Sequence, residues 1–254
     1  MIVKPKKQLG QHFLNDENIA YNIVKSIQTS NKNVLEIGPG MGVLTKYLLE
    51  NKEINFSVIE IDQESVFYLK KKYPNLNIIE GDFLQFPLDK IYQESLTIIG
   101  NFPYNISSQI LFKLLEHKDI CTELVGMFQK EVAERVAAKP GKKVYGILSV
   151  LLQAFYDIEY LFTVDEHHFT PPPKVKSAVI RITLNPNKKL SCDPALFKNI
   201  IKTAFNQRRK TLRNSLKQFQ FDADFLTDPI FNLRPEQLDV LQFETITQHV
   251  ITQK

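Results

Sequence analysis

The sequence has little of what marks metal-binding, exported or membrane proteins. It has only two cysteines, Cys121 and Cys192, which lie far apart and outside any cluster at metal-ligand spacing. This usage gives no zinc signal and fits a reducing cytoplasm. No apolar run approaches the roughly 18 residues that a membrane-spanning helix needs. No apolar stretch follows the basic N-terminus, as it would in a signal peptide. We therefore expect a folded, soluble, cytoplasmic protein without a metal.

Net charge is also small, and its distribution is more informative than its sum. The formal net charge of +4, from 32 basic and 28 acidic residues, does not by itself indicate a nucleic-acid-binding protein. Between Phe197 and Lys217, however, there are seven basic residues and no acidic one, and the first seven positions add three lysines. Such clusters attract polyanions, which predicts a partner of that kind.

Apolar patterns along the chain alternate between strand and helix. Expected strands cover 34–37, 56–62, 77–82, 96–99 and 123–128, and expected helices cover 19–27, 43–49, 63–72, 107–115 and 130–138. Two further β-rich segments, 158–164 and 177–184, flank a proline triplet, which we expect to be a rigid exposed connector. The alternation predicts an α/β fold with a mostly parallel sheet, whose ligands bind outside the carboxyl ends of the strands. A polar stretch at 185–189 suggests a boundary, with a catalytic domain at 1–186 and a small helical domain at 187–254.

A glycine loop and two acidic residues follow successive strands of this predicted sheet. Gly38-Pro39-Gly40-Met41-Gly42 lies between a strand and a helix, which indicates close approach of a ligand to backbone. Its third glycine comes one position too early for the dinucleotide fingerprint. Glu60 ends the next strand, where a carboxylate can accept hydrogen bonds from both ribose hydroxyls, and Asp82 ends the one after. These positions predict a nucleoside-type cofactor, either NAD or S-adenosylmethionine, and NAD is disfavoured because no hydride-relay residue accompanies it.

The loop Asn101-Phe102-Pro103-Tyr104 follows the fourth strand and suits a flat ring that bears an amine. The side-chain oxygen of Asn101 can accept from the amine, Pro103 stiffens the turn, and Tyr104 can stack on a base flipped out of its strand. An ordinary turn with a buried tyrosine is the alternative. Together with the nucleoside-type site, the loop favours methyl transfer to an exocyclic amine, in which the catalytic residues are Asn101, Pro103 and Tyr104.

Six motifs follow one another along the chain: Gly10-Gln11-His12-Phe13-Leu14-Asn15, Glu36-Ile37-Gly38-Pro39-Gly40, Val58-Ile59-Glu60-Ile61-Asp62, Gly81-Asp82, Gly100-Asn101-Phe102-Pro103-Tyr104-Asn105-Ile106-Ser107 and Phe169-Thr170-Pro171-Pro172-Pro173-Lys174-Val175. Together they resemble the motifs of the KsgA family of small-subunit rRNA adenine N6-dimethyltransferases. The resemblance continues through 205–212 and so covers nearly the whole chain.

The resemblance implies a Rossmann-like class I methyltransferase fold with a seven-stranded sheet. It implies that S-adenosylmethionine is used to dimethylate N6 of two adjacent adenines near the 3′ end of 16S rRNA, in an assembling small subunit, by a monomer. The implied cofactor-binding positions are His12, Leu14, Gly38, Glu60, Asp82 and Asn101. Glu60 would hold the ribose and Asp82 the adenine amine of the cofactor, while Asn101 would border cofactor and target. The family usually has Leu where this chain has Phe102, and many members have Asn where it has His12.

Substrate contacts are expected from Tyr104, Phe169, Lys202, Arg209 and Arg213. Phe169 could form a second stacking face opposite Tyr104 or be a core aromatic at a strand end. The three basic residues are expected on one face of a helix that contacts phosphates, or they form an ordinary solvated face. The competing functions are a 23S rRNA adenine methyltransferase of the macrolide-resistance type and a non-catalytic nucleic-acid-binding relative.

Overall fold

The structure is a computed structural model that describes residues 3–251, and the chain divides into two compact units. The first unit contains residues up to 133 together with 157–184, and the second contains 134–156 together with the residues from 185 onward. The division after Leu184 lies close to the expected boundary at 186. The segment 134–156, expected in the catalytic domain, packs instead in the second unit, because α7 (Ile147–Gln153) buries its leucines against α8 (Pro194–Asn206) and α10 (Val240–Gln248).

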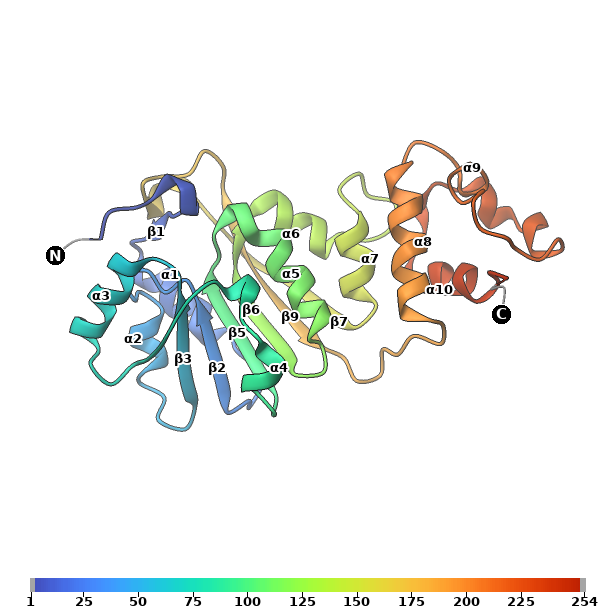
Figure 1. Cartoon of the computed structure of the whole chain (residues 1–254). Coiled ribbons are helices and arrows are strands. Elements are labelled where there is room, and N and C mark those ends of the chain that lie inside the picture. The colour runs from blue at the N-terminus through green and yellow to red at the C-terminus, as the bar shows by residue number, and fades with distance from the viewer. Residues whose placement is uncertain (1–2, 252–254) are drawn as a thin grey trace. The chain divides into compact units, whose positions relative to one another are not determined.

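A seven-stranded sheet organises the first unit (Figure 1). Its strand order is β4 (Asn77–Glu80), β3 (Asn55–Glu60), β2 (Asn33–Ile37), β5 (Leu96–Asn101), β6 (Cys121–Gln129), β9 (Ser177–Leu184) and β7 (Tyr156–Val164). The pairs from β4 to β6 are parallel, whereas β9 pairs antiparallel with β6. The prediction of a mostly parallel α/β sheet is confirmed. The strand β5 runs two residues further than expected, so Asn101 is its last residue.

Helices precede, connect and follow the parallel strands of the sheet. They are α1 (Glu17–Lys25), α2 (Thr45–Leu48), α3 (Gln63–Lys72), α4 (Leu88–Ile91), α5 (Ser107–Glu116) and α6 (Lys130–Ala137). Asp16 begins α1 by accepting a hydrogen bond from the backbone N–H of Ile19 at 3.0 Å, as an N-cap residue does. Buried side chains of α1 and α2 pack with Ile99, Val125 and Met127 of the sheet in one apolar cluster. This packing fixes the strand ends from which the site is built.

A second, two-stranded sheet ties the N-terminal segment to the segment before the proline triplet. The strand β1 (Phe13–Leu14) pairs antiparallel with β8 (Phe169–Thr170), so that Leu14 lies opposite Phe169. The short helix η1 (Lys7–Leu9) precedes β1, and η4 (Glu166–His168) precedes β8. The first two residues of the proline triplet are exposed as expected, but Pro173 is buried.

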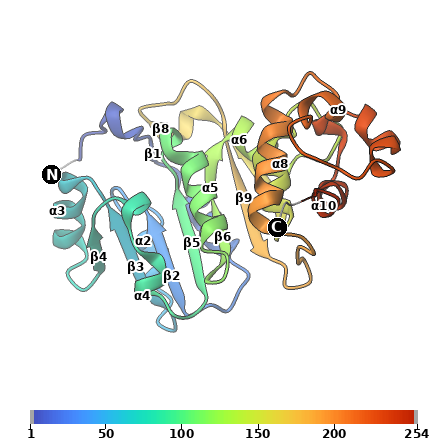
Figure 2. The ribbon, with the colours of Figure 1, turned by 45° about the vertical axis from the view of Figure 1, so that its right-hand side comes forward.

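The second unit is helical, as predicted for the C-terminal part of the chain (Figure 2). Besides α7, α8 and α10 it contains α9 (Leu212–Ser215), η5 (Phe225–Thr227), η6 (Pro229–Asn232) and η7 (Pro235–Gln237). The apolar stripe of α8 is buried at Phe197, Ile200, Ile201 and Ala204. The helix ends at Asn206, so the expected continuous basic face is wrong: Lys202 lies on α8, Arg209 on the following turn and Arg213 on α9.

Candidate cofactor and substrate site

A cavity of about 220 Å³ opens at the carboxyl ends of the parallel strands. Four parts of the chain line it: the segment before β1, the glycine loop after β2, the ends of β3 and β4, and the loop after β5. Seven of the residues expected in the site lie on its wall, namely His12, Gly38, Glu60, Asp82, Asn101, Pro103 and Tyr104. The structure therefore brings together residues up to 92 positions apart in the sequence, as the rule for open α/β sheets predicts.

Glu60 ends β3 with its carboxylate held by backbone. One carboxylate oxygen accepts from the N–H of Gly40 at 3.2 Å and the other accepts from the N–H of Asp62 at 2.9 Å. Only 4% of the residue is exposed, and this burial raises the pKa of its carboxyl although both backbone bonds act to lower it. Each carboxylate oxygen has more than one acceptor position, so two ligand hydroxyls can still be bound.

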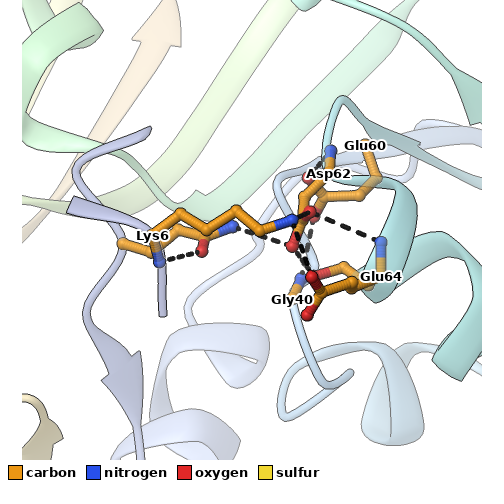
Figure 3. Close-up of polar contacts among 7 residues, drawn as sticks. Lys6, Gly40, Glu60, Asp62 and Glu64 are labelled. Atoms are coloured by element: carbon orange, nitrogen blue, oxygen red, sulfur yellow. Dashed lines mark hydrogen bonds and ion pairs between the residues drawn. The ribbon is translucent and has the colours of Figure 1, made fainter. Parts of the chain in front are cut away.

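A polar network beside Glu60 attaches the N-terminal segment to the rim of the cavity (Figure 3). Lys6 forms ion pairs with Asp62 and, at 3.2 Å, with Glu64. Gln11 donates to Asp62 at 3.4 Å, and its own side-chain oxygen accepts from the N–H of Lys6 at 2.8 Å. Burial acts to raise the pKa of Asp62, but the bonds from Lys6 and Ser65 hold it below its usual value. This network, which the sequence did not reveal, fixes the wall that Gln11 and His12 contribute.

Gly38 and Asp82 form further parts of the wall. Gly38 has φ +63°, a left-handed conformation that glycine adopts without strain, and it directs the chain out of β2. Asp82 accepts from the N–H of Leu84 at 2.9 Å and so begins η2 (Phe83–Gln85). One carboxylate oxygen thus fixes the turn. Within residues 3–251 no group donates a hydrogen bond to the other oxygen of Asp82, and it is available to an amine in the cavity.

Asn101 has its amide oriented by the main chain of the N-terminal segment. Its Nδ2 donates to the carbonyl oxygen of His12 at 2.9 Å. A carbonyl oxygen can only accept, so the amide nitrogen must face it and Oδ1 must face away. No donor to Oδ1 occurs in the described part of the chain, and Asn101 lines the cavity. The contribution of His12 to this contact is its backbone, which any residue type can supply.

Tyr104 is fixed at both its hydroxyl and its ring. Its hydroxyl lies 2.5 Å from Oγ of Ser177, the first residue of β9. Its ring stacks on that of His12, with centroids 5.4 Å apart and planes 28° from parallel. The Nδ1 of His12 lies 2.7 Å from the carbonyl oxygen of Pro171. The imidazole therefore contacts the expected stacking residue, a relation that spacing in the sequence could not indicate.

Two of the residues expected beside the cofactor or the target base, Leu14 and Phe169, do not lie on the wall of the main cavity. Leu14 is 4% exposed and lines a smaller adjoining cavity together with Gly38 and Asn101. Phe169 is 2% exposed and packs in the apolar cluster beneath α1, because its pairing with Leu14 turns the ring inward. Of the two interpretations of Phe169, its burial in this cluster favours a core aromatic at a strand end.

The three basic residues expected to contact RNA all lie in the second unit and are exposed. Arg213 donates to the carbonyl oxygen of Leu226 at 2.9 Å and lies over the ring of Phe231. Their neighbour Arg208 is partly exposed and donates to the carbonyl oxygen of Lys143 at 2.6 Å. Arg208 therefore has a structural contact, and Lys202 and Arg209 are exposed.

Glu36 is a buried carboxyl behind the glycine loop. It accepts from the hydroxyl of Thr45 at 2.6 Å and is 1% exposed. Burial, with a smaller contribution from the charge of Glu60, raises its pKa to about 8 from an ordinary 4.5. Glu36 is therefore protonated at neutral pH in the folded protein but ionised in the unfolded chain.

Replacing Glu36 by glutamine should make stability less dependent on pH. The folded wild type binds a proton that the unfolded chain releases between pH 4.5 and about 8, so its stability falls as pH rises through that window. We expect Glu36→Gln to be more stable than wild type at pH 8.5, by as much as about 4 kcal/mol, and by much less at pH 5. Urea unfolding at both pH values measures this difference. The exposed Glu53→Gln is the control, and equal effects of Glu36→Gln at both pH values would contradict the burial argument.

The sheet and its cavity define a class of protein: this is the class I S-adenosylmethionine-dependent methyltransferase fold, with the glycine loop after β2 and an acidic residue ending β3. Sequence comparison gives the particular family. Residues 2–249 match the family model described as ribosomal RNA adenine dimethylase, and the chain belongs to that family.

Its relatives include proteins named ribosomal RNA small subunit methyltransferase A. The chain is 58% identical to the one from Cytophaga hutchinsonii over 249 residues, covering 96% of each chain. It is 56% identical to the one from Bacteroides thetaiotaomicron, covering 98% of this chain and 95% of that one. The crystal structure of a dimethyladenosine transferase from Plasmodium falciparum is similar, with a TM-score of 0.77, 27% identity and coverage of 91% and 94%. The 23S rRNA methyltransferase ErmE shares the fold, with a TM-score of 0.72 at 23% identity and coverage of 93% and 99%.

The described residues contain neither a metal-ligand cluster nor a membrane-spanning helix. Among residues 3–251, no three histidine, cysteine, aspartate or glutamate side chains are grouped as a metal site requires. No helix in the same range is both long enough and apolar enough to cross a membrane.

Proposed function

We propose that this chain transfers methyl groups from S-adenosylmethionine to N6 of two adjacent adenines near the 3′ end of 16S rRNA, in an assembling small subunit in the cytoplasm. The observation that carries the proposal is the orientation of Asn101. Its amide nitrogen is bound to the carbonyl oxygen of His12, so its side-chain oxygen points away from that carbonyl, and the residue lines the cavity. We take this oxygen as the acceptor for an exocyclic amine. Family membership supports the choice of rRNA adenine as the bearer of that amine.

The residues on the wall fit the proposed cofactor. Glu60 offers a buried carboxylate to two ribose hydroxyls, and Asp82 offers a carboxylate oxygen to an adenine amine. The sulfonium of S-adenosylmethionine supplies an activated methyl group when bound, so the protein needs no strong base. What remains for Asn101 is to hold the target amine with its lone pair directed at the methyl carbon, a positioning effect. Pro103 lies on the same wall and stiffens the turn.

The direct test is methyl transfer to purified ribosomal subunits. With labelled S-adenosylmethionine, we expect label in small subunits from cells that lack the modification, located at two adjacent adenines as N6-dimethyladenine. Subunits that already carry the modification should accept no label and are the matched control. Label in large subunits instead would indicate a 23S rRNA methyltransferase. Absence of label together with RNA binding and no cofactor binding would indicate a non-catalytic relative.

Replacing Tyr104 by alanine should lower turnover much more than cofactor affinity. The proposed role of the ring is to stack on the target base, and such stacking is worth about 1 to 3 kcal/mol per base. We expect kcat to fall by roughly ten- to a hundredfold. Calorimetry should find affinity for S-adenosylhomocysteine within about threefold of wild type. Tyr104→Phe, which keeps the ring and loses only the bond to Ser177, is the control and should retain most activity. An equal loss of turnover and cofactor affinity in Tyr104→Ala would contradict the stacking role.

We also propose that the exposed basic residues of the second unit contact rRNA phosphates. Replacing Lys202, Arg209 and Arg213 together by alanine should weaken binding to the small subunit and reduce its dependence on salt. Each lost phosphate contact lowers the slope of log K against log salt by about one. The control removes the same charge at Lys32, Lys52 and Lys90, which are exposed and precede β2, β3 and β5, at the edge of the sheet opposite the cavity. A slope unchanged in the first variant, or lowered equally in the control, would argue against a specific RNA surface there.

A further inference from the structure

The ring of Phe102 lies in a socket formed by two glycines. Gly100 of β5 and Gly126 of β6 are direct partners in the sheet. A Cβ atom on Gly126 would lie 2.2 Å from Cε2 of Phe102 and 2.6 Å from the carbonyl oxygen of Gly100. One on Gly100 would lie 2.8 Å from Cε1 of the same ring and 2.8 Å from the carbonyl oxygen of Ile37. Real Cβ atoms do not approach other atoms so closely, and Phe102 is only 1% exposed. The ring therefore fills part of the volume that side chains at both glycine positions would need, and backbone carbonyl oxygens fill the rest.

Phe102 makes two further contacts with β6. The N–H of Phe102 donates to the carbonyl oxygen of Met127 at 3.1 Å, and its ring packs on that of Phe128 with centroids 4.8 Å apart. Phe102 and its two chain neighbours, Asn101 and Pro103, all line the cavity. Because protein interiors are close-packed, a shift of the ring has to move the backbone on either side of it.

We propose that Phe102 is a positioning residue, and that the depth of the socket formed by Gly100 and Gly126 sets where the Asn101 amide and the Tyr104 ring stand in the cavity. The inference rests on the proposed function for its catalytic consequence. It assigns a role to Gly126, which lies outside the loop and does not line the main cavity. It also explains how this chain accommodates phenylalanine at this position: β6 has no side chain where the ring lies.

The test is a pair of changes that should compensate one another. Gly126→Ala places a methyl group in the ring position and should displace the loop, lowering kcat at least about tenfold, since a misplacement near 1 Å can cost about a hundredfold. Phe102→Leu shortens the side chain and should lower kcat by only about threefold. In the double variant the methyl group occupies volume vacated by the ring, while its contact with the carbonyl oxygen of Gly100 remains. We therefore expect kcat to recover in part, to at least about threefold above that of Gly126→Ala alone, which is coupling between neighbouring sites.

Measurements besides turnover separate positioning from simple support of the fold. Calorimetry with S-adenosylhomocysteine and small-subunit binding should change less than threefold in Gly126→Ala, so the loss should be in kcat and not in binding. A crystal structure of Gly126→Ala should show the loop displaced, and one of the double variant should show it restored in part. Gly146→Ala is the matched control, because a Cβ there would meet nothing closer than 4.0 Å.

Two outcomes would overturn the inference. They are a double variant whose kcat is the product of the two single effects, and a Gly126→Ala protein with lowered thermal midpoint but wild-type kcat. If Gly126→Ala does not fold, Phe102→Leu and Phe102→Ala decide: kcat should fall progressively as volume is removed, and unchanged kcat would refute the role. The wild type is assayed in the same series. If the wild type transfers no methyl group, the proposed function is wrong. The crystal structures would still show whether the socket formed by Gly100 and Gly126 sets the position of the loop.

Discussion

Asn101→Ala should abolish methyl transfer almost completely, with kcat lowered roughly a hundred- to a thousandfold. The side chain has one fixed bond, from Nδ2 to the carbonyl oxygen of His12 at 2.9 Å, and an oxygen to which no group among residues 3–251 donates. Alanine removes the acceptor for the target amine, and it also frees the N-terminal segment from the end of β5. Single-turnover methylation of small subunits at saturating cofactor measures the chemical step directly.

Asn101→Asp tests whether the orientation of the amide matters, because it keeps an acceptor and removes only the donor to His12. Aspartate keeps an acceptor for the amine but presents a second oxygen to the carbonyl oxygen of His12, where the wild type has a donor. We expect it to be impaired about as strongly as alanine, because two acceptors repel and the acceptor geometry is lost. Asn75→Ala, an exposed asparagine before β4, is the control. A kcat of Asn101→Ala within tenfold of wild type would show that the amide does not position the amine.

The strand ends were predictable because they depend on local patterns. Short apolar runs followed by glycine or acidic residues marked the ends of β2, β3 and β4, and the parallel arrangement then required Gly38, Glu60 and Asp82 to meet at one edge. No contact between distant segments had to be known for this. The result is that most of the cavity wall follows from periodicity and one topological rule.

Features that depend on pairing across long sequence separations were not predictable. The strands β1 and β8 have two residues each, too few for a period-two pattern, yet their pairing decides that Phe169 is buried. The stack of His12 on Tyr104 and the ion pair of Lys6 with Asp62 likewise join segments that no spacing relates. These contacts are formed by folding of the N-terminal segment over the strand ends.

In the second unit, the helical period predicted for α8 was extended beyond the end of the helix. An apolar stripe on α8 was correct up to Asn206, but the same period continued through Arg213 crosses the turn that ends the helix. The helix α7 was missed for a related reason: Leu148, Val150, Leu151 and Leu152 are all buried, so the segment has no polar face to reveal a helical period. Helices that are enclosed on most sides give little signal in a single sequence.

Glu60→Ala should weaken cofactor binding by about a hundredfold or more while lowering kcat at saturating cofactor much less. Hydrogen bonds to a charged acceptor contribute about 1.5 to 3 kcal/mol each, and every 1.4 kcal/mol corresponds to a tenfold change in Kd. Two such bonds to ribose hydroxyls would account for an effect of this size. Calorimetric titration with S-adenosylhomocysteine measures Kd without any methyl transfer.

A modified ligand makes the assignment to the ribose specific. If Glu60 binds the ribose, removing the 2′-hydroxyl from S-adenosylhomocysteine should weaken binding to wild type at least about tenfold, but should have little further effect in Glu60→Ala. The control variant is Glu80→Gln, because Glu80 ends the neighbouring strand with an exposed carboxylate bound to Lys70. Equal sensitivity of wild type and Glu60→Ala to the missing hydroxyl would place the ribose elsewhere in the cavity. Loss of that sensitivity only in Glu60→Ala would show that the carboxylate held by Gly40 and Asp62 binds the sugar.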